Sequence, residues 1–324
     1  MIFYVYLDPK IIAVARENGE LGLQALIGIL YGFRQNCFIA EFDDYSDQIQ
    51  KEIKEQIDEL PETFDRKLIV ELVRQMQKQN RFIYCLTTEY PYTKEALTYV
   101  KEQAPQASLD LILLAEESKD PSDFEGTECA TLLNYQHTQF ERERSKTSCE
   151  GVALAASKYG EQDFLNRYLK KALRFANYLE VCDKVMGEKY KGNYEYTLRV
   201  FFAWLEQILA DPCNCKIIVH CGQPGDQSRG LEAMKVDFSG FKRGNFENIT
   251  LRLCIYEHPT GNDDLPHHRF IVTDQVALGL DRGMDFLSDK TRQNRDITID
   301  YKSSDEVNDL IASYAPSRRL EIDL

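Results

Sequence analysis

The first half of the chain alternates between short apolar runs and longer stretches with helical spacing. The apolar runs are rich in β-branched and aromatic residues, which predicts strands at Ile2–Leu7, Cys37–Phe42, Arg81–Leu86 and Leu109–Ala115. Between these runs the pattern predicts helices at Leu21–Phe33, Gln48–Glu59, Pro61–Gln79 and Thr93–Glu102. Because apolar strands alternate with helices, we expect a parallel sheet covered on both faces.

The second half is again of the α/β type. It is separated from the first half by a turn-rich patch at Lys119–Gly126 and a densely charged stretch at Gln139–Thr147. The pattern predicts helices at Asp163–Tyr178 and Tyr194–Leu209, and strands at Tyr178–Cys182, Lys216–Cys221 and Ile249–Glu257. A length of 324 residues suits two domains. We therefore expect a Rossmann- or PIN-like domain over 1–150, a connector over 151–165 and a second α/β domain over 166–324.

The charge is negative and unevenly distributed. The formal net charge is −14, and the first 150 residues hold 16 basic and 27 acidic residues, against 23 and 26 in the rest of the chain. This balance disfavours a broad nucleic-acid-binding surface, although it leaves room for a local basic pocket. No apolar run approaches the roughly 18 residues of a membrane span, and the first residues lack the basic start of a signal peptide. A soluble cytoplasmic protein is expected.

The cysteines predict reduced thiols. There are nine of them, an odd number without the regular spacing of a disulfide framework. Cys213, Cys215, His220 and Cys221 include metal-binding residue types, but the C-x-C spacing is tighter than that of structural zinc sites. His220 and Cys221 are also adjacent, so on a strand their side chains point to opposite faces. A zinc site is therefore the weaker interpretation.

The segment LPHHRFIVTDQVALGLDRGMDFL carries the strongest candidate chemistry. It contains His267-x-Arg269-x4-Asp274, and residues two apart on a strand point to the same face. His267 and Arg269 would then face one phosphate together. The histidine can attack phosphorus or protonate a leaving oxygen, and the guanidinium can neutralise the charge that develops on the phosphate oxygens. Asp274 can orient a histidine ring or hold the following turn.

This pattern is similar to the His-x-Lys-x4-Asp pattern of the phospholipase D superfamily. From VCDKVMG at Asp183 through HHRFIVTD to GLDRGMDFL, residues 165 to 315 resemble the phospholipase-D-like C-terminal domain of MIT-domain proteins and its bacterial relatives. The resemblance implies a phospholipase-D-like fold for the second domain. It also implies a phosphodiester hydrolase without a cofactor at this site, most simply a nuclease acting on DNA or RNA. For bacterial relatives it suggests a context of toxins or phage defence.

Two departures from the superfamily shape the expected mechanism. Arg269 stands where the superfamily has lysine, and arginine clamps phosphate bidentately but does not give up a proton. The superfamily also uses two histidines, whereas this chain has one full motif. A homodimer can supply the second copy, or His220 can act within one chain. Because branches of this family include binding modules, the alternative is a non-catalytic module for a phosphate-bearing ligand or a protein partner.

Structural roles compete with each of these assignments. His267 and His268 can be solvated loop residues after Pro266, and Arg269 can pair with Asp281 or Asp285. His220 lies in an apolar strand, so it can be a buried core histidine. Asp183 can cap the helix or turn that follows it.

The first half carries a second, weaker candidate site. The strand Ile2–Leu7 is followed by Asp8, which resembles the first strand of PIN-type nucleases, where such an aspartate binds metal. Acidic residues also follow later strands, and carboxylates at the C-terminal edge of a parallel sheet can hold Mg²⁺. The predicted magnesium ligands are Asp8, Asp43, Glu116 and Asp123. The alternative is that they are solvated loop carboxylates in an acidic half.

Overall fold

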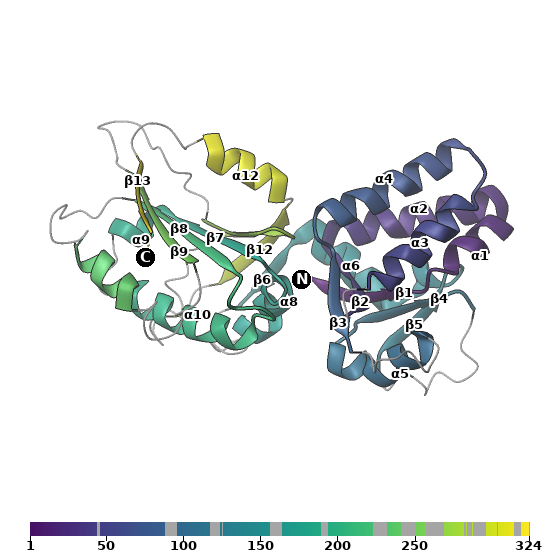
Figure 1. Cartoon of the computed structure of the whole chain (residues 1–324), viewed down its shortest axis with the longest axis horizontal. Coiled ribbons are helices and arrows are strands. Elements are labelled where there is room, and N and C mark those ends of the chain that lie inside the picture. Colours follow the sequence, from purple (N-terminus) through teal and green to yellow (C-terminus); the bar gives the residue numbers. More distant parts are fainter. Residues whose placement is uncertain are drawn as a thin grey trace. The chain divides into compact units, whose positions relative to one another are not determined.

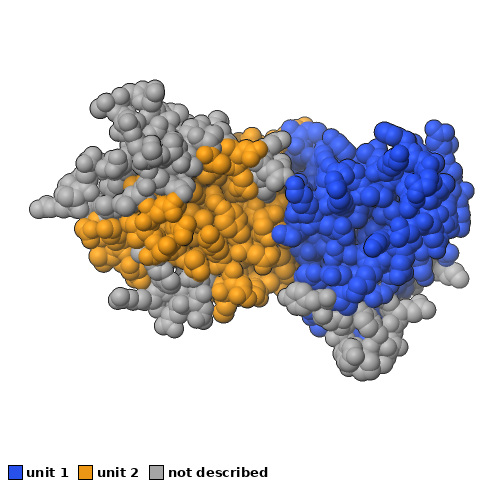
Figure 2. Space-filling model, turned by 45° about the horizontal axis from the view of Figure 1, so that its top comes forward, with its two compact units in different colours: residues 1–149 blue, residues 150–324 orange. Residues whose placement is uncertain are grey.

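The chain divides into two compact units, which Figure 2 shows in different colours. Unit 1 covers Met1–Cys149 and unit 2 covers Glu150–Leu324. The computed structural model describes residues 1–43, 46–87, 96–116, 124, 126–155, 164–188, 194–222, 232–240, 250–256, 269–281, 283, 287, 296–302, 304–313 and 319–323.

Unit 1 is built on a sheet of five parallel strands, in agreement with the expected parallel sheet. The strands are β1 (Phe3–Leu7), β2 (Cys37–Phe42), β3 (Phe82–Leu86), β4 (Leu111–Leu114) and β5 (Glu128–Thr131). Their order is β3-β2-β1-β4-β5, and every neighbouring pair is parallel. The strand order therefore reverses between β1 and β4, and in open α/β sheets ligands bind at such a point, outside the C-terminal ends of the strands.

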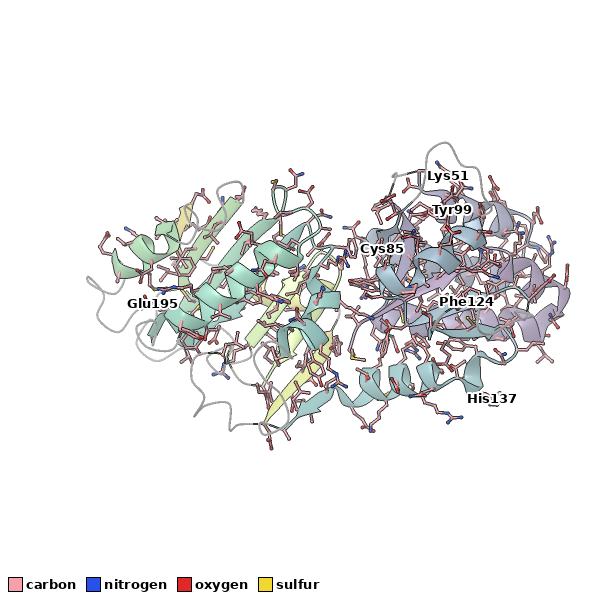
Figure 3. The ribbon with its side chains drawn as sticks, turned by 90° about the horizontal axis from the view of Figure 1, so that it is seen from below. Lys51, Cys85, Tyr99, Phe124, His137 and Glu195 are labelled. Atoms are coloured by element: carbon pink, nitrogen blue, oxygen red, sulfur yellow. The ribbon has the colours of Figure 1, made fainter. Side chains whose placement is uncertain are left out.

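Helices cover both faces of this sheet. They are α1 (Ile11–Glu17), α2 (Gly19–Asn36), α3 (Gln48–Asp58), α4 (Phe64–Lys78), α5 (Ala96–Ala107), the 3₁₀ turn η2 (Tyr135–His137) and α6 (Gln139–Glu150). Figure 1 shows α1 to α4 on one side of the sheet and α5 on the other. On the α5 side, Tyr99 packs edge to face against Phe42, with ring centroids 6.4 Å apart (Figure 3). Coverage on both sides explains why β1 and β2 are buried at every position.

Two buried charged residues of unit 1 satisfy the ends of helices. Glu41 in β2 is fully buried, and its carboxylate accepts from the backbone N–H groups of Phe42, Ile49 and Gln50, the last two in the first turn of α3. Burial raises the pKa of Glu41, while these three N–H donors lower it by a smaller amount. This carboxylate is therefore a helix cap rather than a loop residue.

Arg144 in α6 has the same role at the other end of a helix. Its guanidinium donates to the carbonyl oxygen of Gly32 and to the side chains of Gln35 and Asn36, in the last turn of α2. It also donates to both carboxylate oxygens of Glu141, at 2.7 and 2.8 Å. A Cβ atom on Gly32 would lie 2.7 Å from Arg144 Cζ, so glycine is required where the guanidinium crosses the helix.

Unit 2 contains a mixed sheet of eight strands in the order β13-β9-β8-β7-β10-β11-β12-β6. The strands are β6 (Val152–Leu154), β7 (Tyr178–Asp183), β8 (Lys216–Gly222), β9 (Thr250–Tyr256), β10 (Arg269–Thr273), β11 (Ala277–Leu280), β12 (Ile297–Lys302) and β13 (Arg319–Asp323). The strands β7, β8 and β9 are parallel, whereas β10 is antiparallel to β7. The start of β10 therefore lies at the edge of the sheet where β7, β8 and β9 end.

The helices of unit 2 also lie on both faces of its sheet. They are the π-helical turn η4 (Leu165–Leu169), α8 (Lys170–Leu173), α9 (Lys184–Glu188), α10 (Glu195–Ile208), α12 (Ser304–Ser313) and a further helix over 232–240. Figure 1 shows α12 on one side of the sheet and α10 on the other. The α12 face packs Val307 and Ile311 against Cys182, Phe270 and other buried residues of β7 to β11.

The structure changes two details of the expected organisation. Val152–Leu154 was expected within the connector, but it pairs with β12 as an edge strand of unit 2. Three residues are too few to show a hydrophobic period, so the pairing partner decides their conformation. The helix expected at Asp163–Tyr178 is a π-helical turn followed by one short α-helix. Within the described part of the chain, no helix is long and apolar enough to span a bilayer.

Candidate functional site

A polar cluster lies at the C-terminal edge of the unit 2 sheet, on the α10 face. It consists of Asp183, Tyr194, Arg269 and Gly283, and we call it the Arg269 cluster. Asp183 ends β7 and Arg269 begins β10, and the pairing of Phe270 with Cys182 sets the two charged residues side by side. Arg269 Nε lies 3.7 Å from Asp183 Oδ1, while Asp183 Oδ2 accepts a hydrogen bond from the Tyr194 hydroxyl at 3.0 Å.

The cluster combines a buried anion with a partly exposed cation. Asp183 and Tyr194 are each 1% exposed, whereas the Arg269 side chain is 26% exposed. Arg269 Nη1 donates to the carbonyl oxygen of Asp281 at 3.3 Å, and the buried Nε has no hydrogen-bond partner. Since a guanidinium carries five N–H donors, the described residues leave donors of Arg269 for an anion from solution.

At Gly283 the backbone lies close to the side chains of the cluster. A Cβ atom at this position would lie 2.3 Å from Asp183 Oδ2, 2.6 Å from the Tyr194 hydroxyl and 3.3 Å from Arg269 Nε. Real Cβ atoms essentially never show contacts under 3.0 Å, so a side chain at this position would force Asp183 and Tyr194 to shift. Tyr194 and Gly283 were not among the predicted site residues. The glycine-containing turn GLDRG was visible in the sequence, but nothing local distinguished Tyr194.

The structural alternatives considered for Asp183 and Arg269 are partly realised. Asp183 Oδ1 accepts from the backbone N–H of Val185 at 3.0 Å, as a residue that caps the following turn does. Arg269 meets the carbonyl oxygen of Asp281 and the carboxylate of Asp183. These contacts fix the guanidinium, and a fixed guanidinium is also what anion recognition requires.

Asp274 lies away from Arg269. It follows the last residue of β10, and its carboxylate accepts from the backbone and side-chain N–H groups of Asn177 at 3.1 and 3.2 Å. Five strand residues span about 16 Å, so Asp274 occupies the opposite end of β10. Its bonds with Asn177 tie the β10–β11 turn to the start of β7, whereas the Thr273 hydroxyl bonds the turn residues Gln275 and Val276. Asp274 does not reach the Arg269 cluster.

His220 lies on the opposite face of the sheet. It pairs with Cys182 and Cys254 across β7, β8 and β9, and Cys182 and Cys254 belong to the core beneath α12. The ring is 3% exposed, and its Nε2 lies 2.9 Å from Glu180 Oε2 without the alignment of a hydrogen bond. The structure therefore places His220 as a core histidine and does not bring it to Arg269.

His267, His268 and Asp285 lie outside the described residues. The other described histidine, His137, is exposed in unit 1, where Figure 3 labels it. A role for His267 as nucleophile or acid stays a prediction.

Two buried thiols adjoin Asp183, since Cys182 precedes it on β7 and Cys221 pairs with it on β8. Burial raises the pKa of the Cys182 and Cys221 thiols well above the usual range, and the nearby Asp183 carboxylate adds to both shifts. Thiols with a raised pKa stay protonated and react slowly.

The predicted magnesium ligands of unit 1 are only partly brought together. Asp8 lies at the point where the strand order reverses, and its carboxylate accepts from the backbone N–H groups of Lys10 and Ala115 at 3.0 and 3.3 Å. Asp43 and Glu116 are exposed at the ends of β2 and β4, and Asp123 lies outside the described residues. Among the residues that the structure describes, no three histidine, cysteine or acidic side chains are grouped closely enough to hold a metal ion. The magnesium site stays a prediction.

Searches among protein-family models, curated proteins and solved structures found no match to this chain.

Proposed function

We propose that unit 2 binds a phosphate-bearing ligand through Arg269. One observation carries the proposal: a partly exposed guanidinium is held in place by a buried carboxylate and a backbone carbonyl. Arginine presents a rigid fork of donors that matches phosphate, and prior fixation reduces the entropy lost on binding. The negative net charge favours a small phosphate-bearing ligand over a long nucleic acid that contacts an extended surface.

Phosphodiester hydrolysis is the second candidate function. Its support is the spacing His267-x-Arg269 in the sequence, together with the position of Arg269 at the start of a strand. Hydrolysis would use Arg269 to neutralise phosphate charge and His267 as nucleophile or acid. Ligand binding has the stronger support, because it rests on contacts of Arg269 that the structure describes, whereas His267 lies outside the described residues.

The proposal is tested by phosphate binding to the full chain. Titration calorimetry with inorganic phosphate compares the wild type with Arg269→Gln and Arg269→Lys. A charge-assisted hydrogen bond contributes roughly 1.5–3 kcal/mol, so Arg269→Gln is expected to weaken binding by about 10- to 100-fold, with partial recovery in Arg269→Lys. Arg252→Gln is the matched control, because Arg252 is a partly exposed arginine of the same sheet that pairs with Glu321 and Asp323.

Equal phosphate affinity in the wild type and Arg269→Gln would overturn the binding proposal. Hydrolysis is followed separately with fluorescently labelled DNA and RNA oligonucleotides, in the presence and absence of EDTA. Cleavage that resists EDTA and is lost in His267→Ala supports the phosphodiesterase. Cleavage that requires a divalent metal and is lost in Asp8→Asn assigns the activity to unit 1.

A further inference from the structure

The outer face of α2 in unit 1 presents an uncharged row of residues. Leu21, Gln24, Gly28 and Tyr31 recur at intervals of three and four and are all exposed. Leu21 is 84% exposed and Tyr31 is 50% exposed. We call this row the α2 stripe. It contains no charged residue, although the first 150 residues carry a net charge of −11. An uncharged row with two large exposed side chains on an acidic unit is a candidate surface for contact with another molecule.

Gly28 gives an independent indication that another helix packs on the α2 stripe. Glycine is a poor helix former, so a glycine inside a helix calls for a reason. Gly22 and Gly32 in the same helix have one, since their Cβ atoms would lie 2.3 Å from the Ala15 carbonyl oxygen and 2.7 Å from Arg144 Cζ. A Cβ atom on Gly28 would meet nothing within 4 Å. Among the described residues of unit 1, none gives a reason for glycine at position 28, whereas close approach by a second helix does.

The stripe is complementary to itself in the antiparallel direction. When two copies of α2 cross about an axis beside position 26, Leu21 faces Tyr31 and Gln24 faces Gly28. The acidic residue in the first turn of the helix, Glu20, then approaches Arg34 in the last turn of the partner helix. Antiparallel helices also bring opposite ends of their dipoles together.

Two side chains of the stripe are already held in position. Gln24 donates to Asp65 of α4 at 2.7 Å, and the Arg34 guanidinium lies 4.9 Å from the centre of the Tyr31 ring. Phe64, next to Asp65, is 78% exposed and adds apolar area beside the stripe. Contacts that are ordered before binding lose less entropy when the complex forms.

We infer that the α2 stripe is the interface of a homodimer, in which two α2 helices cross antiparallel about a two-fold axis. Each Gln24 lies over the Gly28 of the partner, and Leu21 packs against Tyr31. Such an interface is isologous, so the same patch serves both copies. One helix pair buries less than the roughly 1,600 Å² of a standard interface, and the dimer is therefore expected to dissociate on dilution.

Sedimentation velocity over a concentration series tests the dimer with the full chain. We expect Leu21→Glu and Tyr31→Glu each to raise the dimer dissociation constant at least tenfold. Val236→Glu, which changes a 67% exposed valine of unit 2, is expected to leave it unchanged. A wild type that stays monomeric at every concentration, or a dimer that withstands both substitutions, would overturn the inference.

Gly28→Ala separates the interface from a role within the helix. The new methyl group meets open space in the monomer, so the monomer is expected to melt at a higher temperature. The same group lies beneath Gln24 of the partner and is expected to weaken the dimer. Unchanged dimer affinity in Gly28→Ala would contradict the proposed crossing point.

Disulfide trapping tests the direction of the helices. Gln24→Cys and Gly28→Cys are made separately in a background in which the exposed Cys149 and Cys213 are serine. We expect a mixture of the two proteins to form a cross-linked heterodimer under mild oxidation, because position 24 faces position 28. Efficient cross-linking of each variant with itself, without cross-linked heterodimer in the mixture, would show a parallel arrangement and contradict the antiparallel one.

Discussion

Replacing Arg144 with methionine is expected to destabilise unit 1 by about 3–5 kcal/mol, the usual effect of removing one partner of a buried ion pair. The Arg144 and Glu141 side chains are 7% and 14% exposed, and the guanidinium also satisfies the Gly32 carbonyl oxygen at the end of α2. Methionine fills similar space but removes the Arg144 donors from the Gly32 carbonyl oxygen and from the Glu141 carboxylate, which keeps the hydrogen bond from the Tyr135 hydroxyl. The loss of stability is expected to appear as faster hydrogen exchange in α2 peptides, measured by mass spectrometry.

The chain supplies a matched control and an internal reference for this measurement. Arg74 pairs with Glu71 at the same i,i+3 spacing and 2.9 Å, but both side chains are well exposed. Arg74→Met is therefore expected to change stability by no more than about 1 kcal/mol. Trp204, the single tryptophan, lies in unit 2, so its fluorescence reports the unfolding of that unit in urea. Equal exchange in Arg144→Met and Arg74→Met would show that the buried pair is not needed for stability.

Replacing Gly283 with alanine is expected to destabilise unit 2 by about 1–3 kcal/mol, the range for overpacking a filled site. The added Cβ would lie 2.3 Å from Asp183 Oδ2, so the carboxylate or the backbone must move. Movement of Asp183 releases Arg269, and we therefore also expect weaker phosphate binding. Urea unfolding followed by Trp204 fluorescence measures the first effect, and calorimetry measures the second.

Gly240 provides the comparison for Gly283. A Cβ atom on Gly240 would meet nothing within 4 Å, and this residue ends the helix over 232–240 in the same unit. Gly240→Ala is expected to unfold at the wild-type urea concentration or slightly above it. If Gly283→Ala behaves in the same way and binds phosphate normally, the tight approach at the Arg269 cluster has no energetic consequence.

The two proposals concern different units and can fail independently. Phosphate binding depends on Arg269 in unit 2, whereas the dimer depends on the α2 stripe in unit 1. A homodimer was expected in order to bring two copies of the His267 motif together. The inferred interface rests on a different observation, the unexplained Gly28, and it does not require that the motifs meet.

The sequence was sufficient for most elements of unit 1. Runs such as FYVYL in β1 and CFIAEF in β2 are buried throughout, because a parallel sheet with helices on both faces excludes water along whole strands. Such runs are local, so they can be recognised without knowing the neighbours. The same holds for α4, whose apolar stripe and Thr63 cap both lie within one short segment.

The candidate site could be predicted only in part. Arg269 was found because its chemistry and spacing are local, whereas Asp183 was noted only within the family resemblance and as a possible cap. Asp274 was grouped with Arg269 by the spacing of the motif and His220 as a second histidine, yet one lies at the far end of β10 and the other on the opposite face. Strand direction and register decide such relations, and no single segment encodes them.

The amino-acid sequence by itself determined the two α/β halves, the parallel sheet of the first and the position of one arginine suited to phosphate. Only the tertiary structure decided that Tyr194 and Gly283 join Asp183 around that arginine, that Val152–Leu154 becomes a strand, and that a Cβ atom on Gly28 would meet nothing within 4 Å. The physical reason is the separation along the chain between the residues that interact. Apolar periodicity depends on residues within one element, whereas polar clusters and close backbone approaches depend on strands that pair across long separations in the chain.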